Sequence, residues 1–128
     1  MLRIEGVGVL KRFATKRIPT IDPKYYTEVV AGMRGAVIGG TCRRANIEGI
    51  EVCGKTGTAQ NPHGRDHSAF MGFAPMNNPK IAVAVYVENG GFGAEYGVPI
   101  GSLMIEKYLK GEVKRTEMEN QMMNSRIK

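Results

Sequence analysis

Gly54-Lys55-Thr56-Gly57-Thr58-Ala59-Gln60 says more about the fold than any other stretch of this 128-residue chain. Counted back from its lysine, the segment 49–56 satisfies G-x-x-x-x-G-K-[ST], the pattern of a phosphate-binding P-loop. Counted forward, Lys55-Thr56-Gly57 is a triplet that an unrelated class of enzymes carries on a β-strand. The residues around the triplet have to decide between the two.

The surroundings of the lysine disagree with a P-loop. That motif needs a buried strand before its first glycine and a helix that starts at its lysine. The segment 43–48 is too polar for a buried strand, and Gly57 and Pro62 exclude a helix after Lys55. The sequence instead predicts a strand from 50 to 60, which runs through the triplet.

Composition fits one ordinary globular domain, with 42% hydrophobic residues and a net charge of +6. The basic pairs are scattered and no aromatic residues alternate with them, so we expect no nucleic-acid partner. No apolar run approaches the roughly 18 residues of a membrane-spanning helix. Cys42 and Cys53 match neither C-x-x-C nor a zinc pattern, which favours two unpaired thiols and leaves a disulfide open.

Two helices are predicted from apolar spacing and end signals. The first runs from 22 to 38, with Asp22 as N-cap, Pro23 at its first position and glycines at its end. The second runs roughly from 95 to 109. The apolar faces expected for these helices are Tyr26, Val29, Val30, Met33 and Val37 in the first, and Ile100, Leu103, Met104 and Tyr108 in the second.

The remaining strand signals complete an antiparallel sheet. Residues 2 to 10 predict a weak strand, and residues 68 to 74 and 80 to 88 predict a hairpin. Because both faces of 80–88 are apolar, we expect it to be a central strand covered on two sides. The fold class is therefore α/β of the α+β type, with three to four antiparallel strands packed by helices.

The K-T-G residues have a specific chemistry when they lie on an accessible strand. Lys55 supplies a fixed cation, and the Thr56 hydroxyl can hydrogen-bond a substrate carboxylate. Gly57 has no side chain, so a substrate backbone can lie along the strand. The backbone N–H of Thr58 is placed to stabilise a developing oxyanion.

Further segments extend this pattern in a fixed order. They are Phe70–Pro75, Asn78–Pro79, Ile81–Val85, Glu88–Gly91 and, before the triplet, Tyr26–Gly40 with Thr41. In combination they resemble the C-terminal part of the transpeptidase domain of class B penicillin-binding proteins of the elongation type (penicillin-binding protein 2). The resemblance covers roughly residues 18 to 111. It implies a partial β-lactamase/transpeptidase-like fold in residues 1–111. Residues 112–128 are charged by composition and predict a tail that is mobile or docks onto another part of the protein, and the spacing of Met118 and Met122 allows a loose helix there.

The resemblance implies a serine-type peptidoglycan D,D-transpeptidase that cross-links stem peptides and is acylated by β-lactams. By position, Lys55 is the K-T-G lysine, Thr56 and Thr58 bind the substrate or antibiotic carboxylate, and Gly57 leaves room for the substrate. The Thr58 N–H forms one half of the oxyanion hole. No cofactor is implied. The implied partners are stem peptides, β-lactams, an upstream part of the same protein and the cell-wall elongation machinery.

The family's nucleophile motif S-x-x-K and its S-x-N motif have no acceptable match in the chain. Ser125–Lys128 fits S-x-x-K, but a nucleophile needs a rigid, buried helix, and these are the last four residues. Neither Ser68 nor Ser102 is followed by lysine at the third position. We therefore expect an inactive fragment, whose membrane anchor at the periplasmic face of the inner membrane lies outside this chain. We also expect one apolar sheet face to be exposed and the chain to self-associate.

Other functions remain open at this point. A β-lactamase or β-lactam sensor of the same superfamily, or a non-catalytic binding module, would carry the same triplet. His63, Asp66 and His67 lie close together in the chain. However, Pro62 and Gly64 prevent helical pairing of the histidines and no further ligand completes a site, so we expect no metal.

Overall fold

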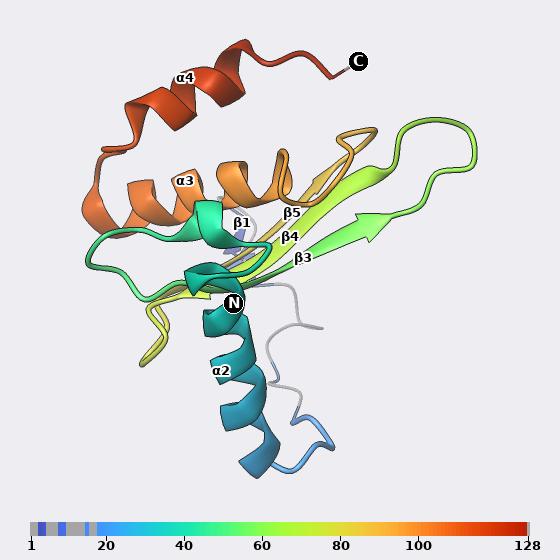
Figure 1. Cartoon of the computed structure of the whole chain (residues 1–128). Coiled ribbons are helices and arrows are strands. Elements are labelled where there is room, and N and C mark those ends of the chain that lie inside the picture. Colours follow the sequence, from blue (N-terminus) through green and yellow to red (C-terminus); the bar gives the residue numbers. More distant parts are fainter. Residues whose placement is uncertain (1–2, 5–7, 10–14, 16–17, 128) are drawn as a thin grey trace.

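The main sheet forms from the three segments that the sequence predicted as strands. The computed structural model describes residues 3–4, 8–9, 15 and 18–127. Its main sheet has the order β3-β4-β5, with β3 at Cys53–Ala59, β4 at His67–Ala74 and β5 at Ile81–Val87 (Figure 1). All pairs are antiparallel, which confirms the α+β class, the hairpin from β4 to β5 and a strand through Lys55.

The prediction for β5 is wrong in one respect. β4 is the central strand, and among the described residues β5 pairs only with β4. Its residues alternate between half-buried and exposed, so one face is covered and the other is not. Apolar side chains on both faces predicted a central strand, but no described segment covers the face that carries Ala82, Ala84 and Tyr86.

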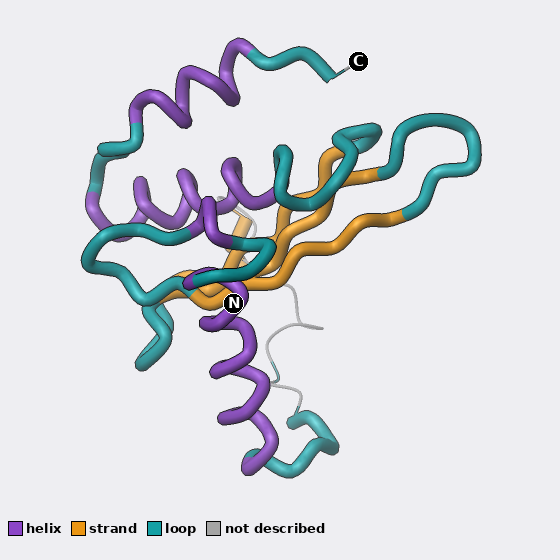
Figure 2. The backbone as a smooth tube through the Cα atoms, viewed as in Figure 1, coloured by secondary structure: helices purple, strands orange, loops and turns teal. Residues whose placement is uncertain are grey.

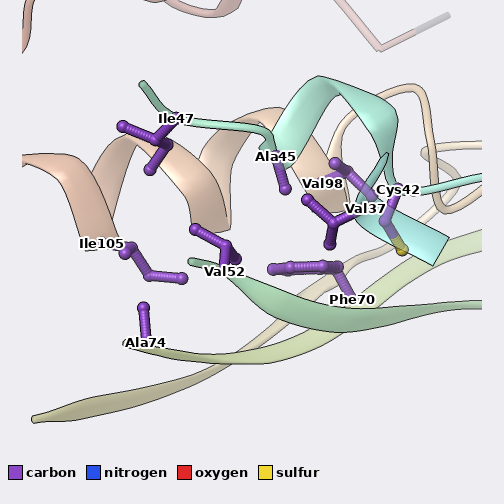
Figure 3. Close-up of a cluster of buried hydrophobic side chains, with 9 residues drawn as sticks. All are labelled: Val37, Cys42, Ala45, Ile47, Val52, Phe70, Ala74, Val98 and Ile105. Carbon is purple, nitrogen blue, oxygen red and sulfur yellow. The ribbon is translucent and has the colours of Figure 1, made fainter. Parts of the chain in front are cut away.

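The covered face packs against α3, which spans Gly97–Lys110 (Figure 1). The core lies between this helix, the sheet and the turn after the first long helix. Figure 3 shows the Phe70 ring next to the sheet, with Val37, Val98 and Cys42 above it. The buried cluster contains Val37, Cys42, Ala45, Ile47, Val52, Phe70, Ala74, Val98 and Ile105.

α3 buries only part of the face that its large apolar residues predicted: Leu103 is buried and Ile100 is half-buried. Met104 and Tyr108 are exposed, whereas the small residues Gly101 and Ser102 are buried. A Cβ at Gly101 would lie only 2.6 Å from the Phe70 ring. Close approach of helix and sheet thus decides the buried face, and close approach requires small residues.

The first long helix, α2, spans Lys24–Ile38 and projects away from the sheet on the side opposite α3 (Figure 2). The predicted start is wrong by one residue: Pro23, and not Asp22, is the N-cap, and Lys24 is the first helical residue. Asp22 still accepts a hydrogen bond from the Lys24 backbone N–H at 3.0 Å. Of the predicted apolar face only Val37 is buried, because no described residues pack against the first turns of the helix.

The C-terminal segment folds back over α3. A short turn of 3-10 helix, η1 (Arg43–Ala45), lies below the C-terminal segment, and α4 (Thr116–Asn124) in that segment forms an outer layer (Figure 1). The Arg115 Nε donates to Glu106 Oε2 at 2.8 Å, and its Nη1 donates to the Arg44 carbonyl at 2.9 Å. The helix in 116–124 is compatible with the charged tail foreseen for 112–128, whose mobility stays a prediction.

The N-terminal stretch contributes little to the described fold. Within residues 2 to 10, β1 (Arg3–Ile4) and β2 (Gly8–Val9) pair antiparallel in a separate two-stranded sheet. The rest of that stretch lies outside the described residues. No helix in the described part of the chain has the length and apolarity needed to span a bilayer.

The uncovered sheet face is apolar, as expected. Met71 is 61% exposed and Tyr86 58% exposed on this face, and Tyr25, Val29 and Ile38 are exposed on α2. Contiguous exposed apolar surface promotes association. We therefore predict that the isolated chain self-associates in sedimentation experiments at high concentration. A clean monomer there would contradict this prediction.

A second prediction concerns the buried ion pair. Glu106 keeps 2% of its side chain exposed and Arg115 keeps 21%. Glu106→Ala should lower the free energy of unfolding by about 3 kcal/mol, because it leaves the arginine charge in a largely buried site. Urea unfolding measures the loss.

The neighbouring pair Lys114–Glu112 provides the control. It is 3.9 Å long, and its side chains are 66% and 67% exposed. Lys114→Ala should therefore change the free energy of unfolding by less than about 0.5 kcal/mol. Equal effects of the two substitutions would show that α4 is not anchored through Glu106.

Candidate functional site

Strand geometry separates the side chains of the K-T-G triplet. In the register Thr56 pairs with Phe70, which faces α3, so Thr56 and Thr58 lie on the covered face. Lys55 and Gly57 lie on the uncovered face with Met71 and Ala69. The Lys55 Nζ turns back to donate to the Thr56 carbonyl at 3.0 Å. The structure thus places the four predicted site residues together on one strand, but on alternate faces.

β3 leaves one edge open. Among the described residues it pairs only with β4, so a row of its backbone N–H and C=O groups has no strand partner. From Gly57 to Ala59 the strand is exposed. A Cβ placed at Gly57 would meet only the Ala69 Cβ, at 3.4 Å. The described packing therefore does not require glycine at this position.

The Thr56 hydroxyl has a partner far away in sequence. The Thr41 Oγ1 lies 2.8 Å from Thr56 Oγ1. Thr41 follows the glycines that end α2, where the chain turns towards η1. The sequence placed Thr41 only in a segment that resembles the family and gave it no role. No local pattern indicates that two residues 15 positions apart share a hydrogen bond.

The two cysteines lie inside the core, and neither forms a disulfide, in agreement with the prediction of unpaired thiols. Burial raises the pKa of the Cys42 thiol, and the nearby polar groups of Thr41 and Thr56 and the charge of Lys55 oppose this effect. Burial also raises the pKa of Cys53. Both groups therefore stay protonated at neutral pH and act as small core residues.

Gly93 supports the K-T-G strand from the covered face. A Cβ there would lie 2.5 Å from the Ala69 carbonyl oxygen and 2.6 Å from that of Gly57. No signal in the sequence distinguished this glycine from Gly90 and Gly91 in the same loop. Its close contact fixes the distance between the loop before α3 and the triplet.

Hydrogen bonds hold that loop in place. Arg65 and Glu95 form an ion pair of 2.7 Å between the loop after β3 and the loop before α3. The Ser68 hydroxyl donates to the Phe92 carbonyl at 2.9 Å and accepts from the Gly97 N–H at 3.0 Å. The loop that carries Gly93 is therefore fixed on both sides.

A hollow of about 310 Å³ opens on the uncovered face beside Lys55. Its floor consists of small residues, Gly57, Ala69 and Ala84, and Met71 and Tyr86 stand around it. The Lys55 side chain borders an apolar surface here. It is exposed, and the Thr56 carbonyl is its hydrogen-bond partner within the described chain.

The residues considered for a metal have other partners. Asp66 accepts a hydrogen bond from the Asn61 N–H at 3.1 Å, and the Nδ1 of His67 accepts from the Asn89 N–H at 2.9 Å. The described residues contain no group of three or more His, Cys, Asp or Glu side chains that could hold a metal ion.

The three serines are engaged in structural hydrogen bonds. Ser68 bridges the loop before α3, as described above. Ser102 is buried and donates to the Pro99 carbonyl at 2.9 Å, within its own helix. Ser125 donates to the Met122 carbonyl at 2.8 Å, just after α4. None of these hydroxyls contacts Lys55 or Thr56.

Residues 12–106 match the sequence profile of the penicillin binding protein transpeptidase domain. The chain belongs to this family. The match covers most of the sequence and includes the K-T-G strand, the hairpin and most of α3. Membership in the transpeptidase family agrees with the resemblance inferred from the motifs.

Curated relatives carry names of the same kind. The peptidoglycan D,D-transpeptidase PbpA of Mycobacterium tuberculosis is 41% identical over 81 residues, which cover 55% of this chain and 16% of that protein. The peptidoglycan D,D-transpeptidase MrdA of Haemophilus influenzae is 31% identical over 145 aligned positions, which cover 94% of this chain and 22% of that protein. The chain thus spans about a fifth of the length of these transpeptidases.

Solved structures of the transpeptidase family share the fold. Penicillin-binding protein A from M. tuberculosis, in its ceftriaxone acyl-enzyme complex, superimposes with a TM-score of 0.63 at 34% identity, covering 70% of this chain and 22% of that one. Pseudomonas aeruginosa PBP2 in complex with WCK 5153 has a TM-score of 0.59 at 40% identity, and the match covers 77% of this chain and 23% of that one. The sheet and its helices therefore form part of a transpeptidase domain.

The two glycines beside the triplet give a test of this geometry. Gly93→Ala should lower the free energy of unfolding by about 1 to 3 kcal/mol, because its Cβ would collide with backbone oxygens that cannot move aside. Gly57→Ala, the matched control, should change it by less than about 0.5 kcal/mol. Urea unfolding of both variants measures the difference. Equal losses would show that the loop does not rest on the strand as described.

Proposed function

We propose that these 128 residues form the K-T-G wall of the active site in a serine-type peptidoglycan D,D-transpeptidase, an enzyme that cross-links stem peptides and is acylated by β-lactams. The observation that carries the proposal is the open edge of β3 at the triplet, in a chain of the transpeptidase family. Names of the relatives and the acyl-enzyme complex of one neighbour support it.

Each residue of the triplet has a role in this proposal. Lys55 supplies positive charge beside the nucleophile, and the Thr56 and Thr58 hydroxyls bind the carboxylate of the stem peptide or antibiotic. The Thr58 N–H donates to the oxyanion, which is stabilised best by a donor that is fixed before the reaction. Gly57 keeps the strand edge clear for the substrate backbone.

The empty space at Gly57 supports this role. Intramolecular packing explains a glycine when a Cβ would collide, as at Gly93. At Gly57 it would not, since the nearest atom is 3.4 Å away. A glycine that the fold does not need is explained by a bound partner that needs the space, here a substrate lying along β3.

We further propose that the nucleophile and its lysine come from a part of the protein outside these residues. The three serine hydroxyls are occupied in structural hydrogen bonds. Ser68 is the strand partner of Thr58, but its hydroxyl bonds the loop before α3. Ser102 and Ser125 bond within α3 and just after α4. We also propose that the site faces the extracytoplasmic side of the inner membrane as part of a larger enzyme, a location that fits the peptidoglycan D,D-transpeptidases among its relatives. Its partners would include the upstream part of that enzyme and the cell-wall elongation machinery.

Labelling with a fluorescent penicillin tests the function. The complete gene product that carries these residues should form a stable covalent adduct, whereas the isolated 128-residue chain should form none. A stoichiometric adduct on the isolated chain would contradict the proposed origin of the nucleophile. An unreactive gene product would indicate a non-catalytic binding module, and rapid hydrolysis of a chromogenic β-lactam would indicate a β-lactamase.

Gly57→Ala makes the same test specific for the site. In the complete gene product it should slow acylation by about tenfold, because the added methyl group occupies the substrate's path. Its free energy of unfolding should stay unchanged, as argued above. Unchanged acylation would exclude β3 as the strand that the substrate lies along.

A further inference from the structure

The hydroxyl pair Thr41–Thr56 is a feature that the roles above do not use. The two Oγ1 atoms lie 2.8 Å apart. On its other side Thr56 is confined by Gly93, where a Cβ would lie 2.9 Å from the Thr56 Cβ. Threonine has few χ1 rotamers to choose from, so contacts on both sides restrict the direction of its hydroxyl.

The chain around Thr41 is itself firmly held. The Cys42 N–H donates to the Ala36 carbonyl at 2.9 Å, which closes the end of α2. Cys42 is fully buried. Two residues later, the Arg44 carbonyl accepts the hydrogen bond from Arg115 at 2.9 Å. Thr41 is therefore presented to Thr56 from a backbone that is fixed on both sides.

The direction of the proton in this pair matters for carboxylate binding. A hydroxyl has one proton to donate and can accept hydrogen bonds through its lone pairs. When Thr41 donates to Thr56, the proton of Thr56 remains available for a substrate carboxylate. In such a chain each hydrogen bond also polarises the next.

We propose that Thr41 is a positioning residue: its hydroxyl donates to Thr56 Oγ1 and so directs the Thr56 proton towards the carboxylate of a stem peptide or β-lactam. This inference rests on the proposed function and deepens it. It separates orientation, supplied by Thr41, from contact with the carboxylate, made by Thr56. The exposed position of Thr41 at the end of α2 lets its side chain be changed without opening the core.

The test compares a β-lactam that has a carboxylate with one that lacks the charge. Acylation rate constants are measured in the complete gene product for benzylpenicillin and for its methyl ester. Thr41→Val should slow acylation by benzylpenicillin by about threefold to tenfold, the usual effect of one lost hydrogen bond. The ester should react at an unchanged rate. Thr41→Ser, which keeps the hydroxyl, should restore most of the rate with benzylpenicillin.

The control is Thr27→Val, which removes an exposed hydroxyl from α2 at a distance from the triplet. It should react like the wild type with both compounds. An equal loss with both compounds in Thr41→Val, an unchanged rate with both, or no recovery in Thr41→Ser would each overturn the positioning role. A wild-type protein that benzylpenicillin does not acylate would overturn the proposed function, and with it this inference.

Discussion

The packing of the Phe70 ring determines how the sheet and α3 come together. The ring lies where glycines leave room for it on two strands and on the helix. A Cβ at Gly54, Gly72 or Gly101 would approach it to between 2.5 and 2.7 Å. Phe70 is also the strand partner of Thr56, so the packing of its ring fixes how far the K-T-G strand lies from the core. The site is thus built beside a tightly packed part of the core.

Polar groups on α3 extend this arrangement to the rest of the chain. Glu106 is buried and holds Arg115, and Arg115 reaches the carbonyl of Arg44 in η1. Arg44 in turn donates to the Glu95 carbonyl and to Gln121 in α4. A buried charge is costly unless it is paired, so Glu106 needs Arg115 beside it. These contacts connect the C-terminal helix to the turn that carries Thr41, although α4 itself lies in the outer layer.

Local sequence patterns predicted the helices and strands. They did not predict which face of each one is buried. Alternation identified the strands, and helical spacing identified both long helices to within a few residues. The predicted face of α3 was only partly right: Leu103 is buried, but small residues such as Gly101 pack on Phe70 where hydrophobicity pointed to Met104 and Tyr108. The strand at 81–87 was predicted to be central because both of its faces are apolar, but one of these faces has no cover within the described residues.

The same distinction applies to the site. The motif located the residues that carry the proposed chemistry, because those residues are neighbours in sequence. Their supports, Thr41 and Gly93, come from segments 15 and 37 positions away from Thr56, and only the folded chain brings them together. No local pattern marks a threonine or a glycine as the partner of a distant strand.

The two faces of β3 differ in how many described groups surround the proposed site residues. On the covered face, the Thr56 hydroxyl has Thr41, Gly93 and the buried Cys42 around it. On the uncovered face, Lys55 is exposed and bonds a carbonyl of its own strand. A catalytic cation must be held by other groups to keep a fixed position. In the proposed enzyme the groups that orient Lys55 would therefore approach from the uncovered face, where the apolar hollow lies. The nucleophile and the carboxylate would then meet the triplet from opposite sides of one strand.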